Sequence, residues 1–170
     1  VAILNAIEPG ENIRRAGEDI QAGDIALRAG MTIGPAQLGL AAALGATELQ
    51  VHPRPRVGVL VTGAELVEPG RSLQPGQIYD SNSFALAAYV REAGCEPVEL
   101  GIADDTKEDL QEKIDYALSE CDAVITVGGV SVGEYDLVKQ VLADLGCEQR
   151  FWKVAMRPGK PFVFATRGDK

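Results

Sequence analysis

A glycine pair followed by two acidic residues in the middle of the chain suits a metal-assisted phosphate site. The segment from Cys121 to Leu145 reads CDAVITVGGVSVGEYDLVKQVLADL. Gly128 and Gly129 would let an anion approach the backbone N–H groups at the start of a helix. Glu134 and Asp136 would repel a phosphate there unless a cation lay between them. The pattern predicts an anion-binding loop with a divalent metal ion, and the alternative is an ordinary tight turn between strand and helix.

This loop lies between a predicted strand and a predicted helix. Ala123 to Val127 form a short apolar run, which is typical of a strand buried on both faces of a parallel sheet. Ser131 and Glu134 have the spacing of a capping box, and apolar residues at helical spacing follow from Leu137 to Leu145. The segment therefore predicts a strand, a glycine turn and a helix that begins near Gly133.

From Arg56 onward the chain repeats strands and helices of similar length. The apolar patterns predict strands at 57–61, 97–102, 123–127, 151–155 and 162–165, and further helices at 83–91 and 106–119. Such alternation predicts an α/β fold with a mostly parallel sheet in three layers, covered by helices on both faces. Cys95, Cys121 and Cys147 precede three of the strands at equal intervals. Because no His accompanies them, we expect small buried residues rather than a catalytic thiol.

The first part of the chain has a different pattern. Short β-like pieces at 24–27 and 31–33 are followed by a predicted helix at 35–44 and a predicted strand at 47–51. Pro53 and Pro55 form a stiff linker. We therefore expect a small α+β segment at 1–53 and an α/β domain at 54–170.

Charged side chains follow the carboxyl ends of the predicted strands, where ligands of parallel sheets bind. Glu65 follows the first strand, Asp104 and Asp105 follow the next, and Asp136 lies in the glycine loop. Three cations come near the last strands, namely Lys153, Arg157 and Lys160. Carboxylates for a metal and cations for an anion indicate a phosphorylated substrate that is handled with a divalent ion.

The composition narrows the classes of function. A hydrophobic content of 46% is enough for a full core, and the net charge of −9 argues against nonspecific binding of nucleic acid. No apolar run approaches the roughly 20 residues of a membrane helix, and the first residues lack the pattern of a secretory signal. We therefore expect a cytoplasmic protein with neither a membrane nor a nucleic acid as partner.

Several longer motifs occur in series along the chain. They read NIRRAGEDI, AGDIALRAG, RPRVGVLVTGAELVEPG, GQIYDSN, VGGVSVGEYD and FWKVAMRPGKP. In this order and spacing they resemble the MoeA family of molybdopterin molybdenumtransferases, which includes the E domain of gephyrin. The resemblance implies that adenylylated molybdopterin is bound, AMP is released and molybdate is inserted with Mg²⁺. It also implies a homodimer, and an α/β domain shared with the adenylylating MogA-type enzyme, a further candidate partner.

The same resemblance assigns roles by position. Catalytic roles fall on Asp19, Glu65, Asp104, Asp136 and Lys153, and Glu65 and Asp136 are the expected metal ligands. Which of the acids binds the metal and which the oxyanion stays open. Ligand-binding roles fall on Thr62, Gly63, Gly128, Gly129, Ser131, Gly133, Arg157 and Lys160. The segment GIADDT is one residue shorter than the family pattern, so Asp104 and Asp105 cannot be told apart. Arg157 stands where the family has Lys, which replaces a point donor with a planar fork.

Two other functions stay open at this point. One is a non-catalytic molybdopterin-binding or scaffold module like gephyrin, and the other is a CinA-type relative that acts on another nucleotide. The acids and cations at the matched positions favour an enzyme, and the FWKVAMRPGKP and NIRRAGEDI segments disfavour the CinA type. Because the family has further portions on both sides, we expect a partial chain that ends within the α/β domain and does not turn over unaided. The sequence does not distinguish molybdate from tungstate.

Overall fold

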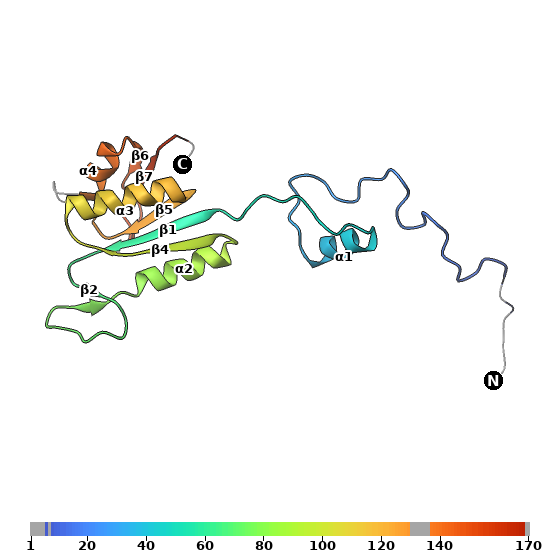
Figure 1. The fold of residues 1–170 in the computed structure, drawn as a ribbon, viewed down its shortest axis with the longest axis horizontal. Coiled ribbons are helices and arrows are strands. Elements are labelled where there is room, and N and C mark those ends of the chain that lie inside the picture. Colours follow the sequence, from blue (N-terminus) through green and yellow to red (C-terminus); the bar gives the residue numbers. More distant parts are fainter. Residues whose placement is uncertain (1–5, 7, 130–136, 169–170) are drawn as a thin grey trace. The chain divides into compact units, whose positions relative to one another are not determined.

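The computed structural model describes residue 6, residues 8–129 and residues 137–168, in two compact units (Figure 1). The units are Val1–His52 and Pro53–Lys170. Each has its own elements and is described by itself. Among the described residues, no helix is both long enough and apolar enough to cross a membrane.

The first unit contains the helix α1 (Pro35–Ala43), which confirms the helix predicted at 35–44. The strands predicted at 24–27, 31–33 and 47–51 were wrong, because these residues form turns and irregular segments. Extended segments need a hydrogen-bonded neighbour, and here the backbone pairs locally instead. The N–H of Asp24 donates to the carbonyl of Gln21, and that of Met31 to the carbonyl of Arg28.

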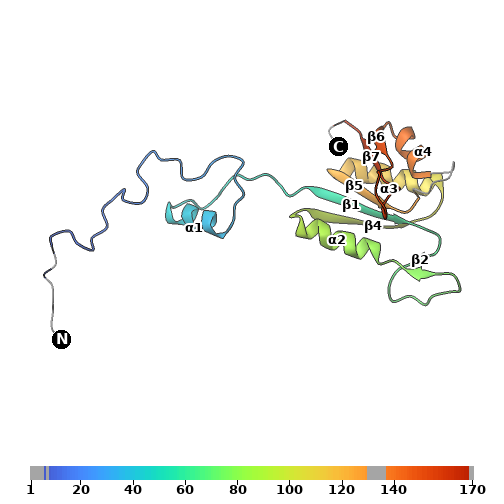
Figure 2. The same cartoon turned by 180° about the vertical axis from the view of Figure 1, so that it is seen from behind.

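The second unit is built on a parallel sheet in the order β4-β1-β5. Its strands are β1 (Arg56–Thr62), β4 (Glu96–Ala103) and β5 (Ala123–Val127). Helix α2 (Asn82–Glu92) covers one face, and α3 (Lys107–Glu120) and α4 (Leu137–Asp144) lie on the other (Figures 1 and 2). This arrangement confirms the predicted three-layer α/β fold.

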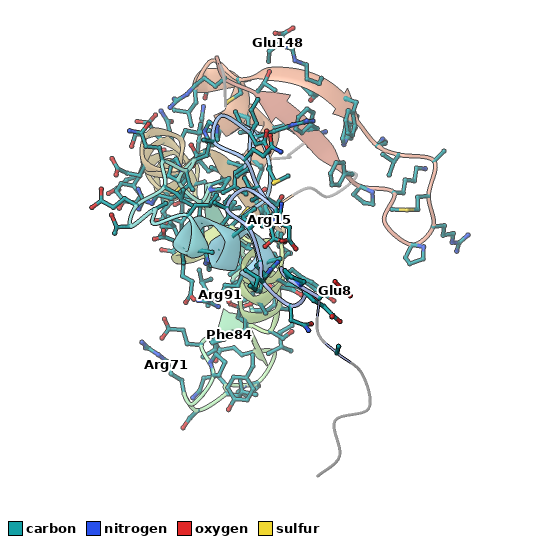
Figure 3. All side chains as sticks on the ribbon, turned by 90° about the vertical axis from the view of Figure 1, so that its right-hand side faces the viewer. Glu8, Arg15, Arg71, Phe84, Arg91 and Glu148 are labelled. Carbon is teal, nitrogen blue, oxygen red and sulfur yellow. The ribbon has the colours of Figure 1, made fainter. Side chains whose placement is uncertain are left out.

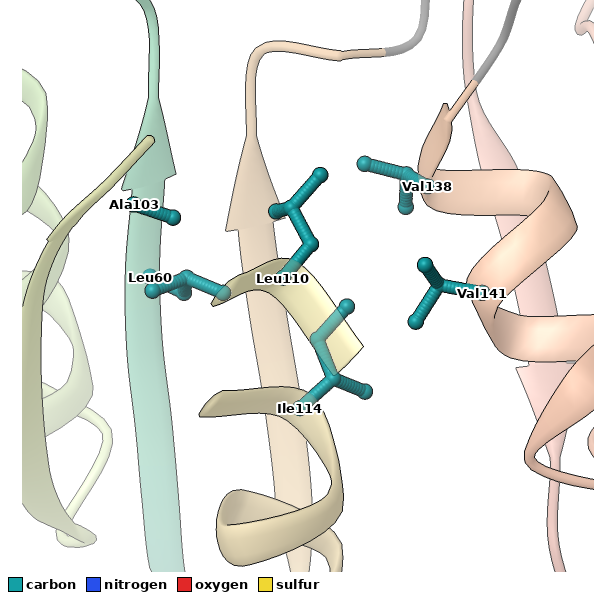
Figure 4. Packing of buried hydrophobic residues seen from close by; sticks show 6 residues of the cluster. All are labelled: Leu60, Ala103, Leu110, Ile114, Val138 and Val141. Carbon is teal, nitrogen blue, oxygen red and sulfur yellow. The ribbon is translucent and has the colours of Figure 1, made fainter. Parts of the chain in front are cut away.

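The central strand β1 supplies the core on both faces of the sheet. Val57 and Val59 pack with Val90 of α2, whereas Leu60 points to the opposite side. Successive side chains of a strand alternate between faces, so one strand serves both layers. Around Leu60 gather Ala103, Leu110, Ile114, Val138 and Val141 (Figure 4). Two helices and two strands therefore share one apolar cluster.

Helix boundaries in this unit follow from capping groups. The buried carboxylate of Asp80 accepts hydrogen bonds from the N–H groups of Asn82 and Ser83, at 3.0 and 3.1 Å, at the start of α2. The hydroxyl of Thr106 accepts from the N–H of Asp109 at the start of α3. Helix ends of this kind satisfy donors that the helix itself leaves unpaired.

Two shorter pairs of strands complete the unit. The loop after β1 is closed by the parallel pair β2 (Leu66–Val67) and β3 (Ile78–Tyr79), and it carries Arg71 (Figure 3). The strands β6 (Glu148–Trp152) and β7 (Val163–Thr166) form an antiparallel pair. The strand predicted at 151–155 thus begins earlier and stops at Trp152, because Lys153 takes a positive φ of 68°.

We predict that Leu110→Ala lowers the free energy of unfolding by about 3 kcal/mol, because Leu110 is fully buried and its removal leaves a cavity. Urea unfolding followed by circular dichroism would measure the change. The control is Leu73→Ala, since Leu73 is 42% exposed and its truncation should have little effect. Equal losses in the two variants would contradict the described core.

Candidate functional site

The carboxyl ends of the three parallel strands meet at one edge of the sheet. Thr62 at the end of β1 pairs with Ala103 at the end of β4, and Val61 pairs with Val127 at the end of β5. The segments that follow these strands therefore begin side by side. They carry Gly63 and Glu65, Asp104 and Asp105, and Gly128 and Gly129.

Asp105 ties two of these segments together. The Thr62 hydroxyl donates to Oδ1 of Asp105 at 2.7 Å, and the Ala64 N–H donates to Oδ2 at 3.1 Å. Both carboxylate oxygens are therefore used by the protein itself. Thr62 is only 5% exposed, so its hydroxyl is directed at Asp105 rather than at solvent. This contact gives Thr62 and Asp105 a structural role.

Asp104 differs from its neighbour in what it binds. Its backbone N–H donates to Oδ2 of Asp109 at 2.8 Å, which fixes the loop at the start of α3. Its carboxylate is exposed and makes no hydrogen bond or ion pair with any described residue. Of the two acids that the sequence could not separate, Asp104 is the one whose carboxylate is available to a ligand.

The glycine pair is required by the packing of the protein's own backbone. A Cβ on Gly128 would lie 2.2 Å from the carbonyl oxygen of Thr62, and one on Gly129 would lie 2.6 Å from Cγ2 of Val138. Both residues also have positive φ, 93° and 64°. Close packing and the backbone conformation therefore account for both glycines without a ligand. The rest of the predicted loop, with Ser131, Gly133, Glu134 and Asp136, lies outside the described residues.

Glu65 lies in the exposed loop after β1. Its backbone carbonyl accepts from the N–H of Ile78 at 2.8 Å, which anchors the loop to β3. Its carboxylate folds back over Gly63, where a Cβ would come within 2.9 Å of Oε2. Gly63 thus leaves the space that the Glu65 carboxylate occupies near the sheet edge.

The predicted cations lie on the segment that joins β6 to β7. The backbone N–H of Lys153 donates to the carbonyl of Phe162 at 2.8 Å, and the N–H of Val154 donates to that of Lys160 at 3.1 Å. Arg157 and Lys160 are exposed. No ion pair or hydrogen bond joins the side chain of Lys153, Arg157 or Lys160 to an acid within the described part of the chain.

The ring of Trp152 contacts the ammonium groups of two lysines, and one of them, Lys139, was not identified from the sequence. The Nζ atom of Lys139, in α4, lies 3.0 Å from the centroid of the Trp152 ring, and that of Lys153 lies 3.7 Å from it. The contact joins the helix after the glycine turn to the end of β6.

Asp19 belongs to the first unit and forms an exposed ion pair with Arg14. The ion pair is a contact within that unit, which is described by itself. The catalytic role assigned to it stays a prediction.

The environment of Cys147 and the burial of Cys121 bear on the roles of these two thiols. Burial raises the pKa of the Cys147 thiol, which disfavours the reactive thiolate. Cys121, at the C-terminal end of α3, is buried. Both observations fit the expectation of small packing residues.

Oxygen donors for a metal are present at the edge but do not form a complete set. Glu65 and Asp104 are of the type that Mg²⁺ prefers. Within residues 8–129 and 137–168, no group of three His, Cys, Asp or Glu side chains could hold an ion. The proposed ligand Asp136 lies outside those ranges, so the predicted metal site is not established.

Two family models together match most of the chain. Residues 58–170 match the model described as "Probable molybdopterin binding domain", and residues 1–45 match the "MoeA N-terminal region (domain I and II)". The chain belongs to the MoeA family. The resemblance inferred from the motifs is therefore confirmed.

Named relatives and solved structures agree with this placement. The chain is 46% identical to the molybdopterin molybdenumtransferase of Haemophilus influenzae, covering 92% of this chain and 39% of that protein. It is 49% identical to molybdopterin molybdenumtransferase 2 of Mycobacterium tuberculosis, covering 95% and 41%. The crystal structure of a molybdopterin biosynthesis MoeA protein from Pyrococcus horikosii matches with a TM-score of 0.78 and 36% identity, covering 91% of this chain and 38% of that one. The chain thus spans about two fifths of each relative.

We predict that Gly128→Ala lowers the free energy of unfolding by about 3 kcal/mol, since the new Cβ would clash with the backbone of Thr62. Gly146→Ala is the matched control. It has a similar positive φ of 73° but nothing within 4 Å of its Cβ, so it should cost only about 1 kcal/mol. Urea unfolding of both variants tests the packing, and equal costs would refute it.

Asp109 should contribute a pH-dependent part of the stability of the Asp104 loop. The hydrogen bond from Lys113, at 2.6 Å, and the one from the N–H of Asp104 hold the pKa of Asp109 below its ordinary value of 3.8. A lowered folded pKa means that the stabilisation is present above 3.8 and is lost as the pH falls through the folded pKa.

Asp109→Asn should therefore lower the free energy of unfolding by about 1 kcal/mol at pH 7. The difference from the wild type should shrink when urea unfolding is repeated at successively lower pH. Asp115→Asn, on the same helix, retains the Asp109 contacts and serves as the control. A difference for Asp109→Asn that stays constant down to the lowest pH would contradict the assignment.

Proposed function

We propose that the chain is the part of a molybdopterin molybdenumtransferase that binds adenylylated molybdopterin, and that the full-length protein releases AMP and inserts molybdate. The observation that carries this proposal is the available Asp104 carboxylate at the carboxyl edge of a parallel sheet, beside the Gly128 turn, in a chain of the MoeA family. The names of the relatives support the reaction class.

In this proposal, the residues at the carboxyl edge of the sheet have different roles. Asp105 and Thr62 hold the ends of β1 and β4 in register, so that Asp104 is presented at a fixed place. The Asp104 carboxylate orients a water molecule toward the phosphoanhydride and accepts its proton as the bond to AMP breaks. Such positioning places the attacking oxygen without a reactive side chain.

Cations bind the oxyanions in the same scheme. Lys153 offers a point charge, and Arg157 offers a planar fork that can donate two parallel hydrogen bonds to phosphate or molybdate oxygens. The fork favours oxygens at a fixed spacing. An Arg at this position should therefore retain binding while making it more sensitive to the geometry of the anion.

Mg²⁺ belongs to the proposal as a cofactor. Glu65 supplies one proposed ligand, and Asp136 supplies the other. When bound, the ion would neutralise charge on the phosphate groups. The homodimer and the partnership with a MogA-type enzyme also stay predictions of the family resemblance.

The decisive experiment measures AMP release from adenylylated molybdopterin by the full-length protein, with and without molybdate and Mg²⁺. The wild type should release AMP in a molybdate-dependent manner. Asp104→Asn and Asp136→Asn should each slow the release by about a hundredfold, because they lose a carboxylate that acts on the reacting groups. Glu112→Gln, on the exposed side of α3, is the matched control and should be unaffected.

Stability separates the two neighbouring acids. Asp105→Asn should lower the thermal unfolding midpoint, because one of its two accepting oxygens is lost, while Asp104→Asn should not. Tight binding of the pterin without AMP release under any condition would refute the proposal and leave the non-catalytic scaffold function in its place. A full rate in Asp104→Asn would remove that residue from the mechanism.

A further inference from the structure

We propose that Asp109 is a positioning residue for the Asp104 carboxylate, and that Lys113 holds Asp109 in the conformation that this role needs. The inference rests on the proposed function, because the reaction assigned to Asp104 belongs to that function. It assigns to the site two residues of α3 that act through Asp104 rather than on the substrate.

The Asp109 side chain is bound from two directions. Its Oδ2 atom accepts from the backbone N–H of Asp104 at 2.8 Å. The Nζ atom of Lys113 donates to Oδ1 and to Oδ2, each at 2.6 Å. The hydrogen bonds from Lys113 and from Asp104 also hold the pKa of Asp109 below its ordinary value of 3.8, so the carboxylate is charged at neutral pH. A charged acceptor makes a stronger hydrogen bond to an N–H group than a neutral one.

The position of Asp109 in its helix explains why it reaches Asp104. Helix α3 begins at Lys107, so Asp109 lies in its first turn, only a few residues after the end of β4 at Ala103. Side chains of a helix tilt toward its N-terminus, which directs this carboxylate back to the segment that precedes the helix. Lys113 follows four residues later, at the spacing that places two side chains on one face. Helix geometry thus places Asp109 against the Asp104 backbone and Lys113 beside Asp109.

The restraint on Asp104 acts through its backbone. Its N–H is held by Asp109, and the next residue, Asp105, is tied by its carboxylate to Thr62 and Ala64. The Asp104 carboxylate itself is exposed and has no hydrogen bond or ion pair with the described residues. The place of this carboxylate therefore depends on the two attachments of the backbone. A catalytic group that is misplaced by about 1 Å costs up to about a hundredfold in rate.

The ion pair of Asp109 and Lys113 is partly shielded from water. The side chains of Lys113 and Asp109 are 29% and 26% exposed, whereas those of the Arg71–Glu68 pair are 72% and 61% exposed. Because solvent and salt weaken exposed pairs most, the shielded pair restrains its members better. A hydrogen bond at the start of a helix also stabilises the fold, so positioning and stability need separate measurements.

The test measures kcat and KM for AMP release from adenylylated molybdopterin by the full-length protein. Asp109→Ala should lower kcat about tenfold and leave KM within about twofold, because the attachment of Asp104 is lost while the binding groups remain. Lys113→Met should lower kcat about threefold, since Asp109 keeps its bond to Asp104 but loses its own restraint. Asp115→Asn removes an acid from the same helix together with its ion pair with Arg167, and is the matched control with no change expected.

A double-mutant cycle shows whether Asp109 acts through Asp104. In an Asp104→Asn background, Asp109→Ala should change the remaining rate by less than about twofold, because the carboxylate that it positions is already absent. A further tenfold loss in that background would mean that Asp109 supports the fold in general, and would overturn the inference. Thermal unfolding midpoints show whether each variant is folded at the assay temperature. If Asp109→Ala does not fold, Lys113→Met takes its place in the same cycle.

The outcomes separate this inference from the proposed function. A normal kcat in Asp109→Ala, together with a large loss in Asp104→Asn, overturns the inference and leaves the proposed function in place. A full rate in Asp104→Asn removes that residue from the mechanism and the inference with it, and a wild type that releases no AMP rejects both. A loss of kcat in Asp109→Ala that disappears in the Asp104→Asn background supports the positioning role.

Discussion

The arrangement of the site depends on the close approach of β1 to the glycine turn. A Cβ on Gly128 would fall 2.2 Å from the Thr62 carbonyl oxygen, so only glycine allows β5 to end beside β1 at this distance. The same approach places Thr62 where its hydroxyl reaches Asp105 on the segment after β4. Three strand ends are thereby fixed relative to one another by contacts of a single residue. These contacts therefore position the side chains that lie at this edge of the sheet.

Two adjacent aspartates, Asp104 and Asp105, make different contacts although their side chains are identical. Asp105 accepts two hydrogen bonds, from the Thr62 hydroxyl and the Ala64 N–H, and these bonds connect the segments that follow β1 and β4. Asp104 contributes its backbone N–H to Asp109 and leaves its carboxylate exposed. Asp105 therefore has fewer acceptor sites left for a ligand than Asp104.

The sequence predicted the regular part of the fold well, because apolar periodicity is a local signal. The strand at 123–127 has its predicted bounds, and α2 and α3 agree within about a residue at each end. The strands expected in the first unit failed because pairing is a non-local property that apolar pieces alone do not supply. For the candidate site, the rule for strand ends placed Glu65, Asp104 and Asp105 at one edge of the sheet, as the structure does. It did not separate Asp104 from Asp105, since the hydrogen bonds of Asp105 involve Thr62 and Ala64, which are distant in sequence.

Helix α4, which contacts the end of β6 through Lys139 and Trp152, is anchored in the hydrophobic core. Val138 and Val141 of α4 face Leu110 and Ile114 in the cluster around Leu60 (Figure 4). Lys139 lies between those two valines in α4, so its backbone is positioned by buried packing, while its side chain contacts the Trp152 ring. The position of the helix and the contact of the ammonium group thus depend on different residues. Loss of the aromatic ring would remove this contact and leave the apolar contacts of α4 in place.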